Sequence, residues 1–101
     1  MTLHSSRGEP AWRAWYKTKR WRDLKLMVHQ RDGYVCQRTG IICDGEYPAD
    51  NSPVADHIRE HRGNAALFWD PANVHTVAKA YHDGEKQKLE QRSLHERGVW
   101  D

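Results

Sequence analysis

The 101-residue sequence has few cysteines, no long apolar run and little net charge. Its two cysteines, Cys36 and Cys43, are too few for a disulfide scaffold or for a zinc site built from cysteine alone. No apolar stretch approaches the roughly 18 residues that a membrane-spanning helix needs. Residues 1–10 also lack the apolar segment typical of a signal peptide. We therefore expect a cytoplasmic protein with reduced cysteines and with neither a membrane nor a nucleotide cofactor as a partner.

Aromatic and charged residues are what the sequence has in abundance. It contains five tryptophans, four tyrosines and one phenylalanine, and 30% of its residues are charged. A disordered chain has little use for five tryptophans, because such side chains stabilise a protein mainly when they are buried. A chain of this length allows only one domain. We therefore expect a single domain with a small aromatic core and charged helices around it.

The first third of the chain predicts a tail and then a helix. Residues 1–10 are polar, with Gly8 and Pro10, and are expected to be flexible, so that the domain covers residues 11–101. Thr18 is a candidate N-cap for a helix that runs to about Arg31 and ends at Asp32-Gly33. Three apolar residues fall on one face of this helix, namely Trp21, Leu24 and Val28. The opposite face is basic, with Lys17, Lys19, Arg20, Arg22 and Lys25.

The rest of the chain predicts short strands and a closing helix. Residues 34–55 alternate apolar segments with turn-forming residues, which indicates short extended segments. Asp70 followed by Pro71 is typical of the start of a helical turn. The remaining predictions are a strand over residues 54–58, a loop over 59–69, a strand over 74–77 and a helix from Lys79 to about Arg97.

Asp56, His57 and His82 are the residues most suited to chemistry. Asp56 and His57 are adjacent on the first predicted strand, so their side chains should point to opposite sides. His82 lies near the start of the closing helix and can return toward Asp56 if the two strands pair and the helix packs across them. A carboxylate and an imidazole form an incomplete ligand set, which suits a divalent ion with positions open to water and substrate.

At these residues the chain resembles the HNH endonuclease family, also called the His-Me finger or ββα-metal nucleases. The resemblance covers roughly residues 15–90 and is closest to the compact HNH proteins of phages and prophages. It implies an α+β fold, with a small ββα-metal core over about residues 53–95 and an additional N-terminal helix. The matching segments are Arg31-Asp32-Gly33, residues 54–58, residues 70–74 and Ala80-Tyr81-His82-Asp83, with Lys86 one turn further on.

The resemblance also implies roles for four residues. Asp56 and His82 would hold one divalent metal ion (magnesium, manganese, nickel or zinc), and His57 would be the general base. Asn73 would tie the loop to the strand and orient His57. The implied reaction is hydrolysis of DNA phosphodiester bonds, nicking or cleaving the duplex with little sequence specificity. Double-stranded DNA is then the expected partner, with phage terminase or portal proteins as candidate protein partners.

Many family members carry a structural zinc, and this chain departs from that pattern. Cys36 matches the first ligand position, but Thr39 stands at the second, and Ala78 and Tyr81 stand where the second pair would be. We therefore expect no structural zinc. Packing of other side chains is expected to replace it, the candidates being Tyr81, Trp69, Phe68 and Ile41 or Ile42. The two cysteines are expected to be small buried residues.

Several basic and histidine residues have two interpretations each. Arg59, Arg62, Lys79 and Lys86 are expected to contact the DNA backbone, whereas Lys88 is expected to be solvated. The basic face with Lys17, Lys19 and Arg20 either binds a neighbouring stretch of duplex or is simply solvated.

His61 and His75 are expected to be solvated, with a third metal ligand or a phosphate contact as the alternative. Surface positions are expected for His4, His29 and His95, and core positions for Trp21 and Trp69, while the places of Trp12, Trp15 and Trp100 stay open.

Two other functions are compatible with the sequence. One is a DNA-binding or packaging accessory protein that has an HNH fold and little catalysis, although the presence of all four site residues argues against it. The other is a purely structural metal-binding module, which the missing cysteines disfavour.

Overall fold

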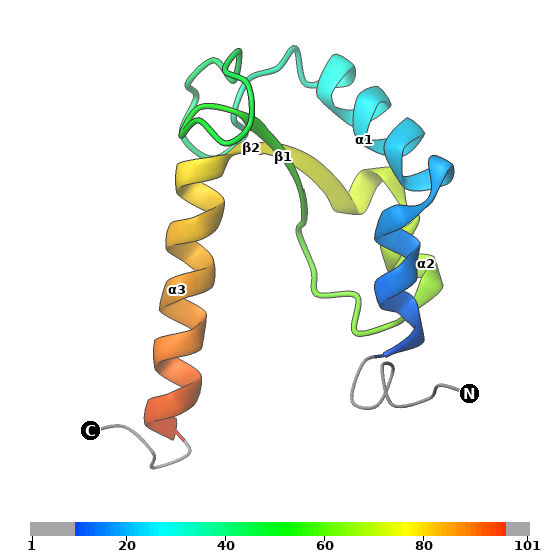
Figure 1. Ribbon diagram of the computed structural model, residues 1–101, viewed down its shortest axis with the longest axis vertical. Coiled ribbons are helices and arrows are strands. Elements are labelled where there is room, and N and C mark those ends of the chain that lie inside the picture. The colour runs from blue at the N-terminus through cyan, green and yellow to red at the C-terminus, as the bar shows by residue number, and fades with distance from the viewer. Residues whose placement is uncertain (1–9, 97–101) are drawn as a thin grey trace.

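A computed structural model describes residues 10–96, without the side chains of residues 86 and 89–96 (Figure 1). It shows a small α+β fold with a two-stranded antiparallel sheet, so the α+β prediction is confirmed. The predictions for residues 1–9, Lys86, His95 and Trp100 fall on parts outside this description. The elements in chain order are η2 (Ala11–Lys17), α1 (Lys19–Arg31), β1 (Pro53–His57), α2 (Ala65–Phe68), η3 (Pro71–Asn73), β2 (Val74–Ala78) and α3 (Lys79–Glu96).

Helix α1 begins and packs as the sequence predicts. The Thr18 hydroxyl oxygen accepts a hydrogen bond from the Trp21 backbone N–H at 3.2 Å, which is the expected N-cap. Trp21 and Val28 are buried, and Leu24 packs against them. After Asp32 the chain turns at Gly33, whose φ of 64° lies in the left-handed region that glycine adopts without strain. Residues 11–17, ahead of the cap at Thr18, form the separate 3-10 helix η2.

The end of α1 is fastened to β2. The Arg31 guanidinium donates to the carbonyls of Pro71 and Val74, at 2.9 and 2.8 Å. The Asp32 carboxylate accepts a hydrogen bond from the Thr76 backbone N–H at 2.8 Å. Burial raises the pKa of Asp32, but the hydrogen bonds from Arg31 and Thr76 outweigh it and hold the pKa below its ordinary value. This carboxylate therefore stays ionised and fixes the place of β2 beside α1.

Strands β1 and β2 pair antiparallel, in a register that sets Asp56 opposite His75 and His57 opposite Val74. Both predicted strands are confirmed to within a residue at each end. Helix α3 follows β2 without a loop and contacts both strands. None of the helices in the described part of the chain has the length and apolarity needed to span a membrane.

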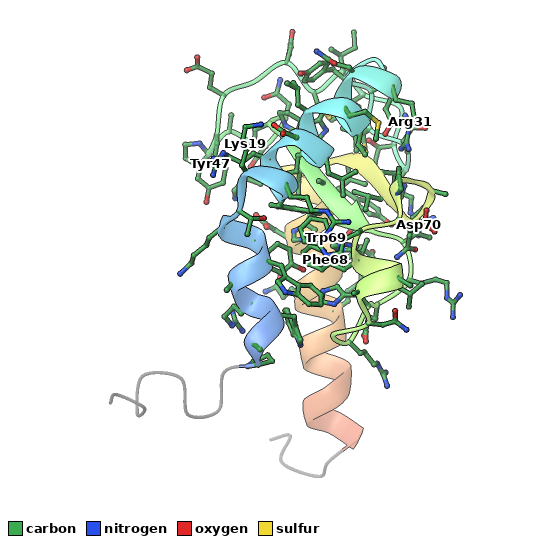
Figure 2. The ribbon with its side chains drawn as sticks, turned by 90° about the vertical axis from the view of Figure 1, so that its right-hand side faces the viewer. Lys19, Arg31, Tyr47, Phe68, Trp69 and Asp70 are labelled. Carbon is green, nitrogen blue, oxygen red and sulfur yellow. The ribbon has the colours of Figure 1, made fainter. Side chains whose placement is uncertain are left out.

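The buried apolar residues form two clusters. One contains Trp21, Val28, Phe68 and Val74, with Trp15 and Trp69 packed against it. Figure 2 shows Phe68 and Trp69 beside the N-terminal helices. The other cluster contains Cys36, Cys43, Val77 and Ala78, with Val54 and Tyr81 packed against it. The core position of Trp21 and the burial of both cysteines are thus confirmed, while Trp69 is partly buried against the core.

Around the two cysteines, the packing differs from the prediction. Tyr81 covers the cysteine cluster as expected, but Ile41 and Ile42 are 47% and 63% exposed because they lie at the end of a turn. Phe68 and Trp69 pack in the other cluster. The expected short strands of residues 34–55 reduce to a single bridge between Val35 and Ile42, apart from the start of β1.

Two local expectations are also wrong. Residues 59–69 are not all loop, because Asn64 caps the short helix α2 by accepting a hydrogen bond from the Leu67 backbone N–H. His29 is not a surface residue. It is 8% exposed, and its Nδ1 lies 2.8 Å from the Thr76 hydroxyl of β2, because α1 packs this side chain against the sheet.

Candidate functional site

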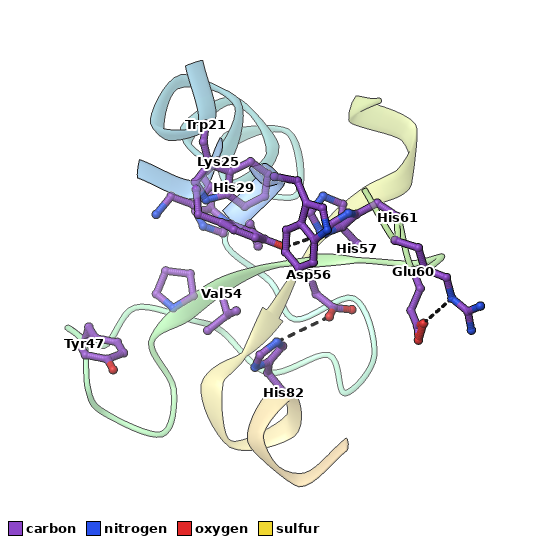
Figure 3. A pocket seen from close by; sticks show the side chains of 15 residues that line it. Trp21, Lys25, His29, Tyr47, Val54, Asp56, His57, Glu60, His61 and His82 are labelled. Carbon is purple, nitrogen blue, oxygen red and sulfur yellow. Dashed lines mark hydrogen bonds and ion pairs between the residues drawn. The ribbon is translucent and has the colours of Figure 1, made fainter. Parts of the chain in front are cut away.

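Asp56, His57 and His82 line one cavity of about 670 Å3 (Figure 3). Helix η2 contributes Tyr16 to this cavity, and His61 comes from the segment after β1. Residues far apart in the chain meet here because α1 packs on both strands, η2 packs on α1, and α3 starts directly after β2. The three residues chosen from the sequence for their chemistry therefore do come together.

Asp56 is held between two histidines. Its Oδ2 lies 3.0 Å from His75 Nε2, and its Oδ1 lies 3.8 Å from His82 Nε2. His75 is the cross-strand partner of Asp56, so the two side chains share a face of the sheet. The His75 side chain is 12% exposed, which makes the expectation of a solvated His75 wrong. Asp56 thus has one oxygen anchored within the sheet and the other directed toward His82.

Asp56 and His82 are the pair most suited to a metal ion. Within the described part of the chain, no group of three or more His, Cys, Asp or Glu side chains is arranged to hold one. A cation would accordingly have two protein ligands here, with water or substrate in its other positions. The His82 side chain is 36% exposed, which leaves room for them.

His57 faces away from Asp56, as alternation along a strand requires. Its Nε2 lies 3.1 Å from the Phe68 carbonyl oxygen, which can only accept a hydrogen bond. Nε2 therefore carries the proton of the neutral ring, and Nδ1 keeps a lone pair. The ring stacks on Trp21 with centroids 5.3 Å apart and planes inclined by 15°.

The environment of His57 lowers its pKa. The largest cause is burial, which disfavours the charged ring, while the Phe68 carbonyl and the Asp56 charge act in the opposite direction. The net effect keeps the imidazole neutral at pH 7. A neutral ring with a lone pair on Nδ1 can accept a proton from water.

Asn73 connects the end of β1 to the loop that follows it. The side chain is buried and makes three hydrogen bonds: Oδ1 accepts from the Arg59 N–H at 2.9 Å, and Nδ2 donates to the carbonyls of Arg59 and Leu67. Leu67 precedes Phe68, whose carbonyl holds His57. Asn73 thus ties position 59, two residues after His57, to position 67, next to the residue whose carbonyl holds the His57 ring.

The cavity also contains Tyr16, which the sequence analysis did not select, and His61, for which a site contact was only the alternative to a solvated side chain. The Tyr16 hydroxyl lies 3.0 Å from His61 Nε2, and the His61 ring is edge-on to His57 with centroids 4.8 Å apart. His61 is 7% exposed, so the expectation of a solvated side chain is wrong. Burial and then the neighbouring His57 lower the pKa of His61. No local pattern links Tyr16 to a histidine 45 residues away, because only the packing of η2 brings them together.

The basic residues expected to contact DNA have mixed surroundings. Arg59 is exposed, Arg62 is 3.1 Å from Glu60, and Lys79 is 2.6 Å from Asp83. The hydrogen bond to Asp83 raises the pKa of Lys79.

On the N-terminal basic face Lys17 is exposed, Lys19 pairs with Asp23 and the Arg20 guanidinium lies 4.1 Å from the centre of the Trp69 ring. Lys88 is exposed as expected, and Lys25 lines the cavity.

No protein-family model, curated protein or solved structure matches this chain. The site itself combines a carboxylate facing an imidazole, a second imidazole with a free lone pair, and a tyrosine hydroxyl around one cavity. Such a set can position a cation, take a proton from water and donate a hydrogen bond to an acceptor.

Proposed function

We propose that this protein is a metal-dependent endonuclease of the HNH type that hydrolyses DNA phosphodiester bonds. The observation that carries the proposal is the convergence of Asp56, His57 and His82 on one cavity. They come from a strand and from the helix that directly follows its partner strand. This order of strand, strand and helix is what the ββα-metal core of that family would require.

The donor pair fits a divalent cation. Bonds from a carboxylate oxygen or an imidazole nitrogen to such a cation are about 2.0–2.2 Å long. Asp56 Oδ1 and His82 Nε2, 3.8 Å apart, are therefore close enough for one cation to contact both. His75 holds the other carboxylate oxygen, in the way that metal-binding carboxylates are commonly oriented by a hydrogen bond. A bound cation would stabilise negative charge on the phosphate and on the leaving oxygen.

His57 supplies the base. Its Nδ1 lone pair takes a proton from the attacking water, and the Phe68 carbonyl stabilises the charged ring that results. Asn73 is a positioning residue, because it holds the chain at Arg59, two residues after His57, and at Leu67, which precedes the residue that bonds the His57 ring. Lowering of the His57 pKa by burial keeps the base available at neutral pH.

Double-stranded DNA is the proposed substrate, with Arg59, Arg62, Lys79 and Lys86 at its backbone. Arg62 and Lys79 would exchange Glu60 and Asp83 for phosphates. Ion pairs at a protein surface contribute little to stability, so the exchange costs little. Phage terminase or portal proteins are proposed as the protein partners.

Plasmid nicking tests this function. Supercoiled DNA is incubated with the protein and Mg²⁺, Mn²⁺ or Ni²⁺, and relaxed and linear products are measured. The wild type is expected to nick, and His57→Ala, His82→Ala and Asp56→Asn to lose at least 100-fold in rate. Asp23→Asn is the matched control for Asp56→Asn, because it removes an exposed carboxylate on α1 away from the cavity. Thermal unfolding of each variant separates loss of activity from loss of the fold.

Equal cutting by the wild type and His57→Ala would refute the role of His57. If no protein cuts but all bind DNA, the accessory DNA-binding function is correct instead. Zinc held at one ion per chain in both the wild type and His82→Ala would favour the structural metal-binding module.

A further inference from the structure

The proton positions of the His61 ring follow from its two hydrogen bonds. The Gly63 backbone N–H donates to His61 Nδ1 at 3.0 Å, so Nδ1 is an acceptor and carries no proton. A neutral imidazole has its single proton on the other nitrogen. His61 Nε2 is therefore the donor, and its partner 3.0 Å away, the Tyr16 hydroxyl oxygen, is the acceptor.

With this assignment the Tyr16 hydroxyl oxygen is the acceptor in its bond with His61, so the hydroxyl proton takes no part in that bond. Among the described residues, the structure gives the hydroxyl no partner other than His61. Burial, followed by Asp56, raises the pKa of Tyr16 although Arg13 lowers it, so the hydroxyl stays protonated at neutral pH. Tyr16 lines the cavity together with Asp56 and His57. Its O–H is thus a neutral donor available to a ligand there.

Tyr16 is 38% exposed, but one side of its ring packs on the core and its hydroxyl is bonded to His61. The Tyr16 ring meets Trp21 and Phe68 edge-on, with centroids 5.3 and 4.9 Å apart. His61 is enclosed in turn by Trp12 and Phe68, at 4.7 and 4.8 Å. A donor fixed before the ligand arrives loses little conformational entropy on binding.

We propose that Tyr16 donates a hydrogen bond to a non-bridging phosphate oxygen of the nucleic acid and that His61 is the positioning residue for this hydroxyl. The proposal rests on the function proposed above and adds a substrate contact to it. A phosphodiester oxygen accepts hydrogen bonds and never donates them. His57 Nδ1 and the Asp56 carboxylate are also acceptors, so neither could hold that oxygen directly. Tyr16 supplies a neutral donor beside His57, in addition to the cationic Lys25 and Arg62 that also line the cavity.

Tyr16→Phe tests the contact, because it removes the hydroxyl and keeps the ring that packs on Trp21. The matched control is Tyr34→Phe, which removes a hydroxyl outside the cavity. Nicking kinetics with Mn²⁺ and fluorescence anisotropy of a labelled 20-base-pair duplex in EDTA are measured for both. Tyr16→Phe is expected to lower kcat/KM by roughly 10- to 100-fold and to weaken duplex binding several-fold, as loss of a hydrogen bond to a charged group would. Tyr34→Phe should match the wild type in both.

The two readouts separate this contact from the proposed catalysis. If the wild type nicks and Tyr16→Phe nicks equally well, the Tyr16 contact is refuted and the endonuclease function stands. If no protein nicks but Tyr16→Phe binds the duplex more weakly than Tyr34→Phe, the contact stands and the catalytic function fails. Equal binding by both variants without nicking by the wild type overturns both.

The positioning role of His61 has its own test. His61→Gln should lower kcat/KM in the Tyr16 background but have little further effect in Tyr16→Phe, because the two residues act through one hydroxyl. Long-range ¹H–¹⁵N NMR spectra of ring-labelled protein should show the His61 proton on Nε2. Additive effects of the two substitutions, or a proton on Nδ1, would contradict the role.

Discussion

Replacing Asn73 by alanine is expected to destabilise the protein by about 2–3 kcal/mol, because a typical net hydrogen bond is worth about 1 kcal/mol. The substitution removes three hydrogen bonds from a side chain that is 7% exposed. It also leaves the N–H and carbonyl of Arg59 and the carbonyl of Leu67 without their side-chain partner. Water can reach part of the exposed Arg59 segment, which keeps the estimate below the sum for fully buried partners.

Urea unfolding followed by tryptophan fluorescence measures this change directly. For a domain of about 100 residues, a loss of 2–3 kcal/mol corresponds to a fall in Tm of roughly 10–20 °C. Nicking by the folded variant should also slow. Without the Asn73 bond to Leu67, the neighbouring Phe68 carbonyl, which holds the His57 ring, is no longer fixed in position.

Asn73→Asp sharpens the test, since it keeps the shape of the side chain. Its carboxylate can still accept from the Arg59 N–H, but it places an oxygen against the two carbonyls that Nδ2 now satisfies. It should therefore be at least as destabilising as Asn73→Ala. A loss below about 0.5 kcal/mol for Asn73→Ala, or wild-type stability for Asn73→Asp, would refute the account of Asn73 as the tie between strand and loop.

Two further predictions concern pH and zinc. Burial lowers the pKa of His29 below its ordinary value, so the unfolded state binds more protons than the folded state, and the free energy of unfolding should fall as pH drops below about 6.5. His29→Gln, which can keep a hydrogen bond to Thr76, should flatten this dependence in urea titrations between pH 8 and 5, and an unchanged slope would contradict it. Cys36 and Cys43 are expected to bind no structural zinc, so elemental analysis of purified His82→Ala, which lacks a ligand of the proposed active-site cation, should find no tightly held zinc, and one zinc per chain in that variant would refute this.

Local patterns predicted the regular elements well. Thr18 caps α1 because its hydroxyl satisfies a backbone N–H of the first turn, an interaction that depends only on neighbouring residues. Asp70 and Pro71 start η3 for the same reason. The alternation of Asp56 and His57 placed these side chains on opposite sides of β1, where the structure has them.

The expectations that were wrong depended on which surfaces pack together. Solvated positions were expected for the polar side chains of His29, His61 and His75. Each is instead covered and bonded to a residue distant in the sequence, namely Thr76, Tyr16 and Asp56 respectively. Ile41 and Ile42 are apolar and read as core, yet the turn that carries them projects into solvent. Burial is a property of the assembled fold, and an isolated residue type records only a preference for it.

Residues close together in the chain were enough to predict strands β1 and β2, the capped helix α1 and the candidate residues Asp56, His57 and His82, because spacing and local hydrogen bonding depend on near neighbours. Three features of the site depend on long-range packing instead: His75 anchors Asp56, the Phe68 carbonyl fixes the proton of His57 on Nε2, and Tyr16 faces the cavity. Each of these contacts joins segments 11 to 45 residues apart. Such contacts form only when the sheet register and the packing of η2 and α1 are set, and no local pattern encodes them.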